Sequence, residues 1–113
     1  MPIDLDPLAR CQPLQGPQHR LPTVDITDWL ASHCPQWQLA GSGQSITRTF
    51  TFPDYYHTMS FVNALAHVAH HQNHHPDLAV HYDRVVVSFS THDVGGVSLN
   101  DLRCALQADA LSE

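Results

Sequence analysis

The chain has 113 residues and a formal net charge of −6 with its histidines neutral, which is enough for one domain with a small core. Its five basic residues are all arginines scattered along the sequence, which argues against general nucleic-acid binding because phosphate contacts need clustered Lys and Arg. No segment approaches the roughly 20 apolar residues that a transmembrane helix needs, so no membrane attachment is expected.

The first 22 residues contain five prolines and are predicted to form an irregular N-terminal arm (1–22), which precedes a single domain at 23–113. That domain is expected to begin with a helix that runs to His33 and is capped by Thr23 or Asp25. The apolar side of this helix comprises Val24, Ile26, Trp29 and Leu30.

A first β-hairpin is predicted over residues 37–52. A short strand at 37–40 leads into a Gly-Ser-Gly turn at 41–43. The next strand, 45–52, alternates between two faces, as a half-buried strand does. One face carries Ile46, Arg48, Phe50 and Phe52, and the other carries only serine and threonine.

The longest helix is predicted over residues 55–72, with Asp54 as its N-cap and Pro76 preventing its continuation. Its apolar face should be wide enough to pack on a sheet. The central stripe of that face comprises Met59, Val62, Ala66 and Ala69, and Phe61, Leu65 and Val68 widen it.

A second hairpin is predicted from strands at 78–82 and 85–91, the latter apolar enough to be central. Residues 98–101 have the pattern of a capping box, which begins a last helix ending near Ala110. The order α-β-β-α-β-β-α predicts an α+β fold, with a four-stranded antiparallel sheet and helices packed on one face.

The three cysteines are Cys11, Cys34 and Cys104, an odd number without CxxC spacing. This usage is typical of free thiols in a reducing compartment. The N-terminus lacks the basic start and apolar stretch of a secretory signal, so a cytoplasmic location is expected.

Ten histidines in a chain of this size are unusual. Five of them fall within nine residues: His67, His70, His71, His74 and His75. Pairs spaced i, i+4 share one face of a helix and could bind a metal ion, but no carboxylate or cysteine follows at a metal-motif spacing. The plainest alternative is a solvated helix end, where histidine interacts well with the helix dipole.

A third interpretation is proton transfer by His74, His75 and His92. The first two lie where the long helix gives way to a strand, and His92 ends the strongest strand, so the fold could bring them together. Imidazole, with an ordinary pKa of about 6.5, can both donate and accept a proton near neutrality. The residues alone leave this interpretation and the solvated one equally open.

The combination of His70, His74-His75-Pro76, Tyr82, His92 and Asp101 resembles the signature of the pterin-4a-carbinolamine dehydratases. The stretches FTFPDYYHTMSFVNALAHVA and STHDVGGVSLNDLRCA are similar to the family's passages on either side of that signature. ARCQPLQG resembles the cysteine-containing arm of some bacterial members. The resemblance covers nearly the whole chain.

The resemblance implies the metal-free dehydration of 4a-hydroxytetrahydropterin to quinonoid dihydropterin, which recycles the pterin used by aromatic amino acid hydroxylases. It implies no cofactor, because the pterin is the substrate, and a homodimer or homotetramer. By position, His74 and His92 would protonate the leaving hydroxyl, one for each stereoisomer, while His75 would orient the pterin and assist deprotonation of a ring N–H. The further pterin contacts implied are Asn73, Ser90 and Thr91.

Weaker supporting roles fall to His70, Pro76 and Asp101. For Asp101, helix capping is the first expectation and orientation of a histidine the second. The chain departs from the family's usual residues twice: His70 replaces a glutamate, and Leu78 replaces an aromatic residue that could stack on the substrate. These departures bear on rate and substrate range more than on the reaction class.

Two other functions remain open. Some family members bind a homeodomain transcription factor and stabilise its dimers, so this chain could be a protein-binding module without catalysis. A histidine-rich metal binder is the other alternative, and it would use His67 and His71 as well as His74.

Overall fold

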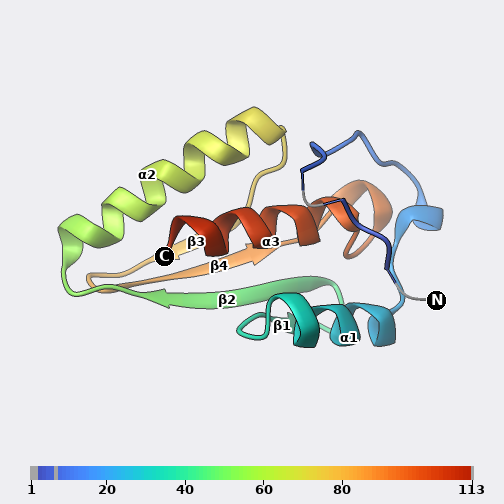
Figure 1. The fold of residues 1–113 in the computed structure, drawn as a ribbon, viewed down its shortest axis with the longest axis horizontal. Helices are drawn as coiled ribbons and strands as arrows, with labels where there is room; N and C mark the ends of the chain where they lie inside the picture. Colours follow the sequence, from blue (N-terminus) through green and yellow to red (C-terminus); the bar gives the residue numbers. More distant parts are fainter. Residues whose placement is uncertain (1–2, 7, 113) are drawn as a thin grey trace.

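In the computed structural model, which describes residues 3–6 and 8–112, four strands form one antiparallel sheet (Figure 1). The strands are β1 (Gln38–Ala40), β2 (Ser45–Thr51), β3 (Asp77–Val80) and β4 (Arg84–Phe89). Their order in the sheet is β1-β2-β4-β3, so the two hairpins meet where β2 pairs with β4. The predicted central place of β4 is confirmed.

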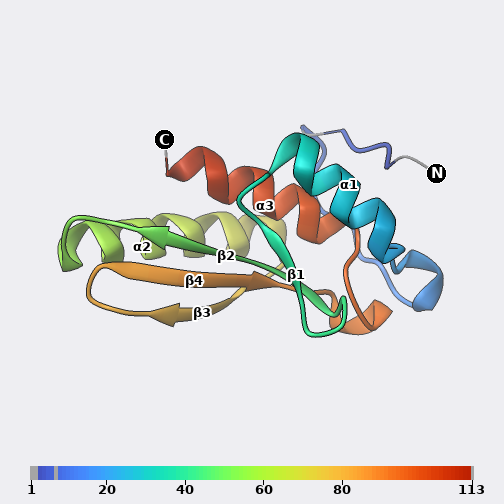
Figure 2. The ribbon, with the colours of Figure 1, turned by 90° about the horizontal axis from the view of Figure 1, so that it is seen from below.

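The α-helices of the described chain cover one face of this sheet (Figure 2). They are α1 (Thr23–His33), α2 (Tyr55–Gln72) and α3 (Leu99–Leu111). Two short 3₁₀ helices, η1 (Pro17–His19) and η2 (His92–Val94), were not predicted. The α+β class and the element order are confirmed.

The hydrophobic core lies between the sheet and the helices. Alternation along β4 buries Val85, Val87 and Phe89 on the helix side, and the register pairs Ile46 and Phe50 of β2 with Phe89 and Val85. The opposite face carries the predicted row of threonines, of which Thr49 and Thr51 are exposed to solvent.

The start of α1 differs from the prediction. Pro22 occupies the N-cap position and no side chain caps the helix, because Thr23 is already its first helical residue. Val24 is 65% exposed, so the buried side of α1 is restricted to Ile26, Trp29 and Leu30.

The second hairpin is shorter than predicted. Its turn lies one residue earlier than predicted, because Val80 pairs with Val85 and the His81 N–H donates to the Arg84 carbonyl, and β3 ends at Val80. β4 ends at Phe89, and Thr91 pairs only with Gly96 in an isolated bridge.

The apolar face of α2 is rotated relative to the predicted stripe. Its buried residues are Thr58, Phe61, Leu65 and Ala69. Thr58 takes part because its hydroxyl donates to the carbonyls of Asp54 and Tyr82, which satisfies the buried polar group. Ala66 is exposed.

Candidate active site

His74 points into the protein because of the way α2 ends. Asn73 has a left-handed backbone conformation (φ 50°, ψ 41°) at the C-cap, and the His74 N–H bonds back to the Ala69 carbonyl. The imidazole then stacks on Phe89 of β4, with ring centres 6.0 Å apart and planes at 12°. Only 13% of the His74 side chain is exposed.

Asp101, in the first turn of α3, is fully buried and binds three partners. Its Oδ1 lies 2.5 Å from His74 Nε2. Its Oδ2 accepts hydrogen bonds from the Thr91 hydroxyl (2.8 Å) and the Ser98 N–H (2.9 Å). Asp101 therefore closes the capping box of α3 and orients a histidine at once, whereas the sequence presented these roles as alternatives.

The pKa of His74 is raised above its ordinary value. Burial alone would lower it, but the hydrogen bond and negative charge of Asp101 outweigh burial, and Cys11 adds a smaller contribution in the same direction. The second ring nitrogen, Nδ1, bonds to no residue that the structure describes. His74 is thus a largely buried imidazole with Nε2 held by a carboxylate, and this contact favours its charged form.

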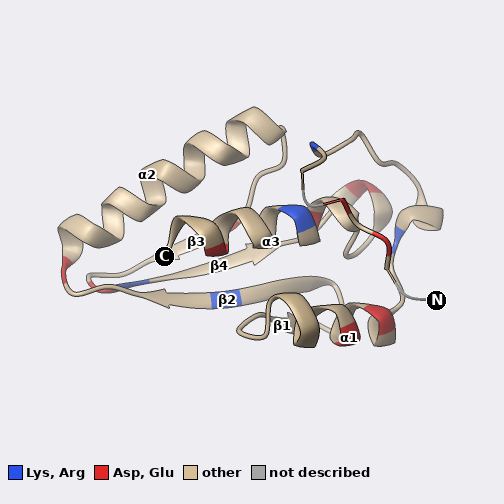
Figure 3. Cartoon of the chain, in the orientation of Figure 1, with Lys and Arg blue, Asp and Glu red and all other residues tan. Residues whose placement is uncertain are grey.

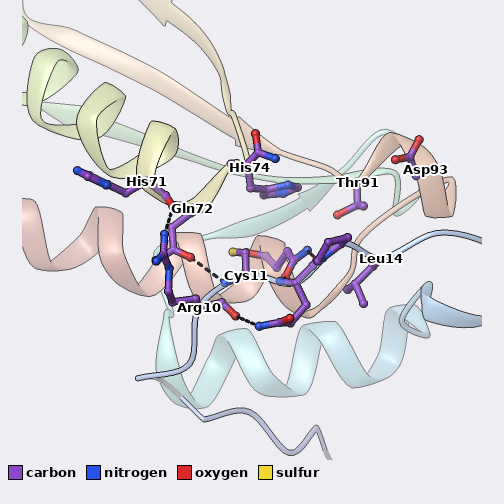
Figure 4. Close-up of a pocket in the computed structure, with 12 residues that line it drawn as sticks. Arg10, Cys11, Leu14, His71, Gln72, His74, Thr91 and Asp93 are labelled. Carbon is purple, nitrogen blue, oxygen red and sulfur yellow. Dashed lines mark hydrogen bonds between the residues drawn. The ribbon is translucent and has the colours of Figure 1, made fainter.

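A pocket of about 470 Å³ lies in front of His74, within the range of small-molecule sites, roughly 300–1,000 Å³ (Figure 4). One wall is residues 10–14 of the N-terminal arm. The other walls are the end of α2 at 71–74 together with Thr91, Asp93 and Asn100. Segments from both ends of the sequence therefore meet at this pocket.

The arm is held in place by specific hydrogen bonds. The Gln12 N–H donates to Asn100 Oδ1 (3.1 Å), and Asn100 Nδ2 donates to the Gln12 carbonyl (2.6 Å). The Cys11 N–H donates to Gln72 Oε1 (2.7 Å), and the Arg10 guanidinium bonds to the His71 carbonyl. The arm follows a fixed path across the ends of α2 and α3.

Some of the residues that the sequence singled out meet at the pocket. Asn73, His74 and Thr91 line it, and Asp101 lies directly behind His74. His92 stands between two lining residues, Thr91 and Asp93, but its own side chain is exposed at the start of η2.

Other predicted positions lie outside the lining of this pocket. His75 and Ser90 are exposed, Pro76 is half-buried and His70 is exposed near the end of α2. Leu78 is paired with Val87 and packs against the core on the helix side of the sheet, away from the pocket lining. Their predicted roles stay predictions.

The sequence did not point to the contribution of the arm. Cys11 and Gln12 line the pocket, yet a proline-rich stretch carries no periodic signal that could place it against α3. The one clue was the resemblance of ARCQPLQG to the arm of some bacterial family members. Asn100 was also missed, although it directly precedes Asp101.

Of the remaining histidines of α2, His71 lines the pocket, whereas His67 and His70 lie outside its lining. His67 and His71 are neighbours, with ring centres 4.3 Å apart. Within residues 3–6 and 8–112, however, no group of three or more His, Cys, Asp or Glu side chains is placed to hold a metal ion. This geometry gives no support to a histidine-rich metal binder.

The charged residues are spread over the molecule. Figure 3 shows the arginines at separate places rather than gathered in one patch. Among the helices of the described chain, none combines the length and apolar character needed to cross a bilayer.

Comparisons with known proteins identify the family of this chain. The family model described as "Pterin 4 alpha carbinolamine dehydratase" matches residues 19–111. A "Putative pterin-4-alpha-carbinolamine dehydratase" from Stenotrophomonas maltophilia is 55% identical, covering 97% of this chain and 96% of the relative. One of the same name from Xanthomonas campestris pv. campestris is 56% identical, covering 96% and 92%.

A crystal structure described as a "transcriptional coactivator/pterin dehydratase" from Brucella melitensis is similar in fold, with a TM-score of 0.78 and 30% identity. The similarity covers 83% of this chain and 99% of that one. The chain therefore belongs to the pterin-4a-carbinolamine dehydratase family.

Proposed function

We propose that this chain catalyses the dehydration of 4a-hydroxytetrahydropterin to quinonoid dihydropterin, without a metal ion, and so recycles a pterin cofactor. The observation that carries the proposal is the buried His74–Asp101 pair at the back of a pocket of suitable size. Family membership supports the same reaction.

The proposed reaction adds a proton to the leaving hydroxyl of the substrate and removes a proton from a ring nitrogen. The bond between the tetrahedral ring carbon and its hydroxyl breaks, and the hydroxyl leaves as water after receiving a proton. The adjacent ring nitrogen loses its proton, and its electron pair forms the new C=N bond. A positioned acid and base contribute typically 10²–10⁴-fold to such a step.

His74 is the acid in this proposal. Asp101 holds Nε2 and favours the charged imidazole, which leaves a proton on Nδ1 for the departing hydroxyl. Asn73 and Thr91 line the same pocket and would bind polar atoms of the pterin ring.

His92 and His75 keep the roles that the family resemblance implies. His92 would serve the opposite stereoisomer, from its place between the lining residues Thr91 and Asp93. His75 would orient the pterin and help to remove the ring proton. We further propose a cytoplasmic enzyme that forms homodimers or homotetramers and acts with an aromatic amino acid hydroxylase.

A protein-binding role is the second candidate. It is favoured by exposed aromatic and apolar residues at the other end of α2 from the pocket, where Tyr55 and Tyr82 stack with ring centres 6.3 Å apart. Tyr56 and Val80 are exposed as well. The Brucella melitensis relative is described as a coactivator, which is consistent with this alternative.

The deciding experiment is a stopped-flow measurement of 4a-hydroxytetrahydropterin decay, with and without protein treated with a chelator. We expect acceleration that survives chelation. His74→Ala and His92→Ala should each reduce it, and the double variant should lose much more. His67→Ala, a change at an exposed histidine of α2, is the matched control. An equal loss in the control would refute the assignment, and no acceleration by folded protein would favour the protein-binding candidate.

A further inference from the structure

Two of the three free cysteines face each other across the boundary between the arm and the body of the protein. Cys11 Sγ, in the arm, lies 3.7 Å from Cys104 Sγ, in α3. Cys11 is partly exposed on the wall of the pocket, whereas Cys104 is 2% exposed. The third cysteine, Cys34, is buried at the end of α1.

The surroundings shift the pKa values of the two thiols in opposite directions. The pKa of Cys11 is lowered to about 7, chiefly by the hydrogen bond with Cys104. The charges of His74 and Arg103 act in the same direction, and burial and Asp101 oppose them. The same hydrogen bond, followed by burial, raises the pKa of Cys104. Near neutral pH, Cys11 is therefore substantially a thiolate, and Cys104 retains its proton.

We propose that Cys11 and Cys104 are a site of reversible oxidation, at which a disulfide fixes the N-terminal arm to α3 as the closed wall of the pocket. Nothing in the dehydration chemistry requires this pair of thiols. The pair stands on geometry: a partly exposed sulfur, a buried partner in contact with it, and a pocket that the connected segment lines.

The oxidant we propose is hydrogen peroxide. The Cys11 thiolate attacks one peroxide oxygen, the O–O bond breaks, and the departing hydroxide takes a proton to become water, which leaves a sulfenic acid. Cys104 then attacks the Cys11 sulfur, the S–S bond forms and the S–O bond breaks, and the second hydroxide takes the Cys104 proton. Two thiols and one peroxide give one disulfide and two waters.

The second step is helped by the first. Part of what raises the pKa of Cys104 is the hydrogen bond to Cys11 and the negative charge of Cys11. Both are lost when Cys11 becomes a neutral sulfenic acid, so Cys104 then gives up its proton more readily.

Formation of the disulfide requires one of the two segments to move. A disulfide needs a separation of about 2.05 Å, so they must move closer than the present 3.7 Å. Cys104 is fixed within α3, but Cys11 lies in an irregular segment attached by a few hydrogen bonds to Gln72 and Asn100. Because Cys11 lies in neither a helix nor the sheet, we expect the arm to be the segment that moves.

The main test is a peptide map of the wild-type protein after peroxide treatment and blocking of the remaining thiols. Trypsin cuts after arginine and places each cysteine in its own peptide, 11–20, 21–48 and 104–113. We expect peptides 11–20 and 104–113 joined, with a mass two hydrogens below their sum, and separated again by dithiothreitol. The proposal would be overturned if links to Cys34 were as frequent as the link between Cys11 and Cys104. It would also be overturned if Cys11 were oxidised to a sulfinic acid without forming a link.

Two variants sharpen the test. Cys34→Ser is the matched control and should still form the link, because burial raises the pKa of Cys34 to about 12 and keeps that thiol unreactive. In Cys104→Ala, alkylation of Cys11 at pH 7 should slow several-fold, because the interaction that lowers its pKa most is lost. Unchanged alkylation in folded Cys104→Ala would overturn the proposed thiol pair.

The effect on turnover rests on the proposed function. If the arm must move for the pterin to enter or leave, the oxidised protein should lose most of its dehydration rate and regain it with dithiothreitol, whereas Cys11→Ser should be insensitive to peroxide. The mass measurement does not depend on turnover. A disulfide without dehydration in either state would reject the proposed function alone, and dehydration without a disulfide would reject this inference alone.

Discussion

Asp101 is the residue on which the candidate site depends most. It is a buried carboxylate that joins the end of α2, the segment after β4 and the N-cap of α3 through His74, Thr91 and Ser98. A local sequence pattern identifies its capping role. Its contact with His74 spans 27 positions and depends on how the two helices meet, so the sequence could only offer it as an alternative.

Asp101→Asn should lower both the pKa of His74 and the proposed activity. The charge that opposes the effect of burial would be gone, so the neutral form of His74 would be favoured. We expect the His74 titration followed by NMR to move to lower pH, and the dehydration rate to fall by about 10²-fold. Asp109→Asn, which removes a carboxylate bonded to Arg48 and Trp37 away from the pocket, is the control. An unchanged His74 titration in Asp101→Asn would disprove the coupling.

The raised pKa of His74 also predicts how stability depends on pH. A raised folded-state pKa contributes stability that is fully present below the unfolded pKa, about 6.5, and is lost as pH rises through the folded value. Urea unfolding should therefore show a larger stability difference between wild type and His74→Gln near pH 6 than near pH 9. Comparing the two proteins at each pH removes the contributions of other groups, and an equal difference at both pH values would contradict the prediction.

At the scale of elements, most of the fold could be predicted because its signals are local. Alternation identified β2, the Asp54 cap and helical periodicity identified α2, and the residues from Ser98 onward identified the start of α3. The face of α2 was misjudged because Thr58, a polar residue, is buried through hydrogen bonds to distant carbonyls. A buried hydroxyl whose hydrogen bonds are satisfied cannot be recognised from the periodicity of hydrophobic residues.

The capping box of α3 should matter for stability. The Ser98 hydroxyl accepts from the Asn100 N–H and contacts the Thr91 hydroxyl at 2.6 Å, in a fully buried position. Ser98→Ala should reduce the free energy of unfolding by about 1–2 kcal/mol, measured by urea denaturation. Ser112→Ala, at the exposed end of the same helix, should change it by less than about 0.5 kcal/mol. If Ser98→Ala and Ser112→Ala reduced the free energy of unfolding equally, the capping box would contribute little to stability.

At the scale of the whole molecule, the arm is the feature that sequence reasoning could not place. Its path depends on side-chain-to-backbone bonds, such as those between Asn100 and Gln12, that join residues 88 positions apart. No local sequence pattern around Asn100 or Gln12 indicates that the two residues are in contact. The candidate site was therefore predicted around His74, His75 and His92, with Asn73, Ser90 and Thr91 as further contacts and without the arm that forms one wall of the pocket.

Asn100→Ala should loosen the arm while leaving the body of the protein folded. Both hydrogen bonds to Gln12 would be lost, so the arm should open more often. We expect trypsin to cleave after Arg10 several-fold faster, with little change after Arg103, which lies within α3. Asn63→Ala, at an exposed position of α2, is the matched control. Cleavage after Arg10 at the wild-type rate would show that other contacts hold the arm.

The meeting of both ends of the sequence at one pocket also sets the order in which the site can form during synthesis. The arm is synthesised before His74, and Asn100 and Asp101, which hold them, are synthesised after both. Until then the arm has no surface to lie on, and His74 titrates as an ordinary histidine. The nascent chain can complete its first hairpin and α2 early, yet the candidate acid acquires its properties only when α3 docks.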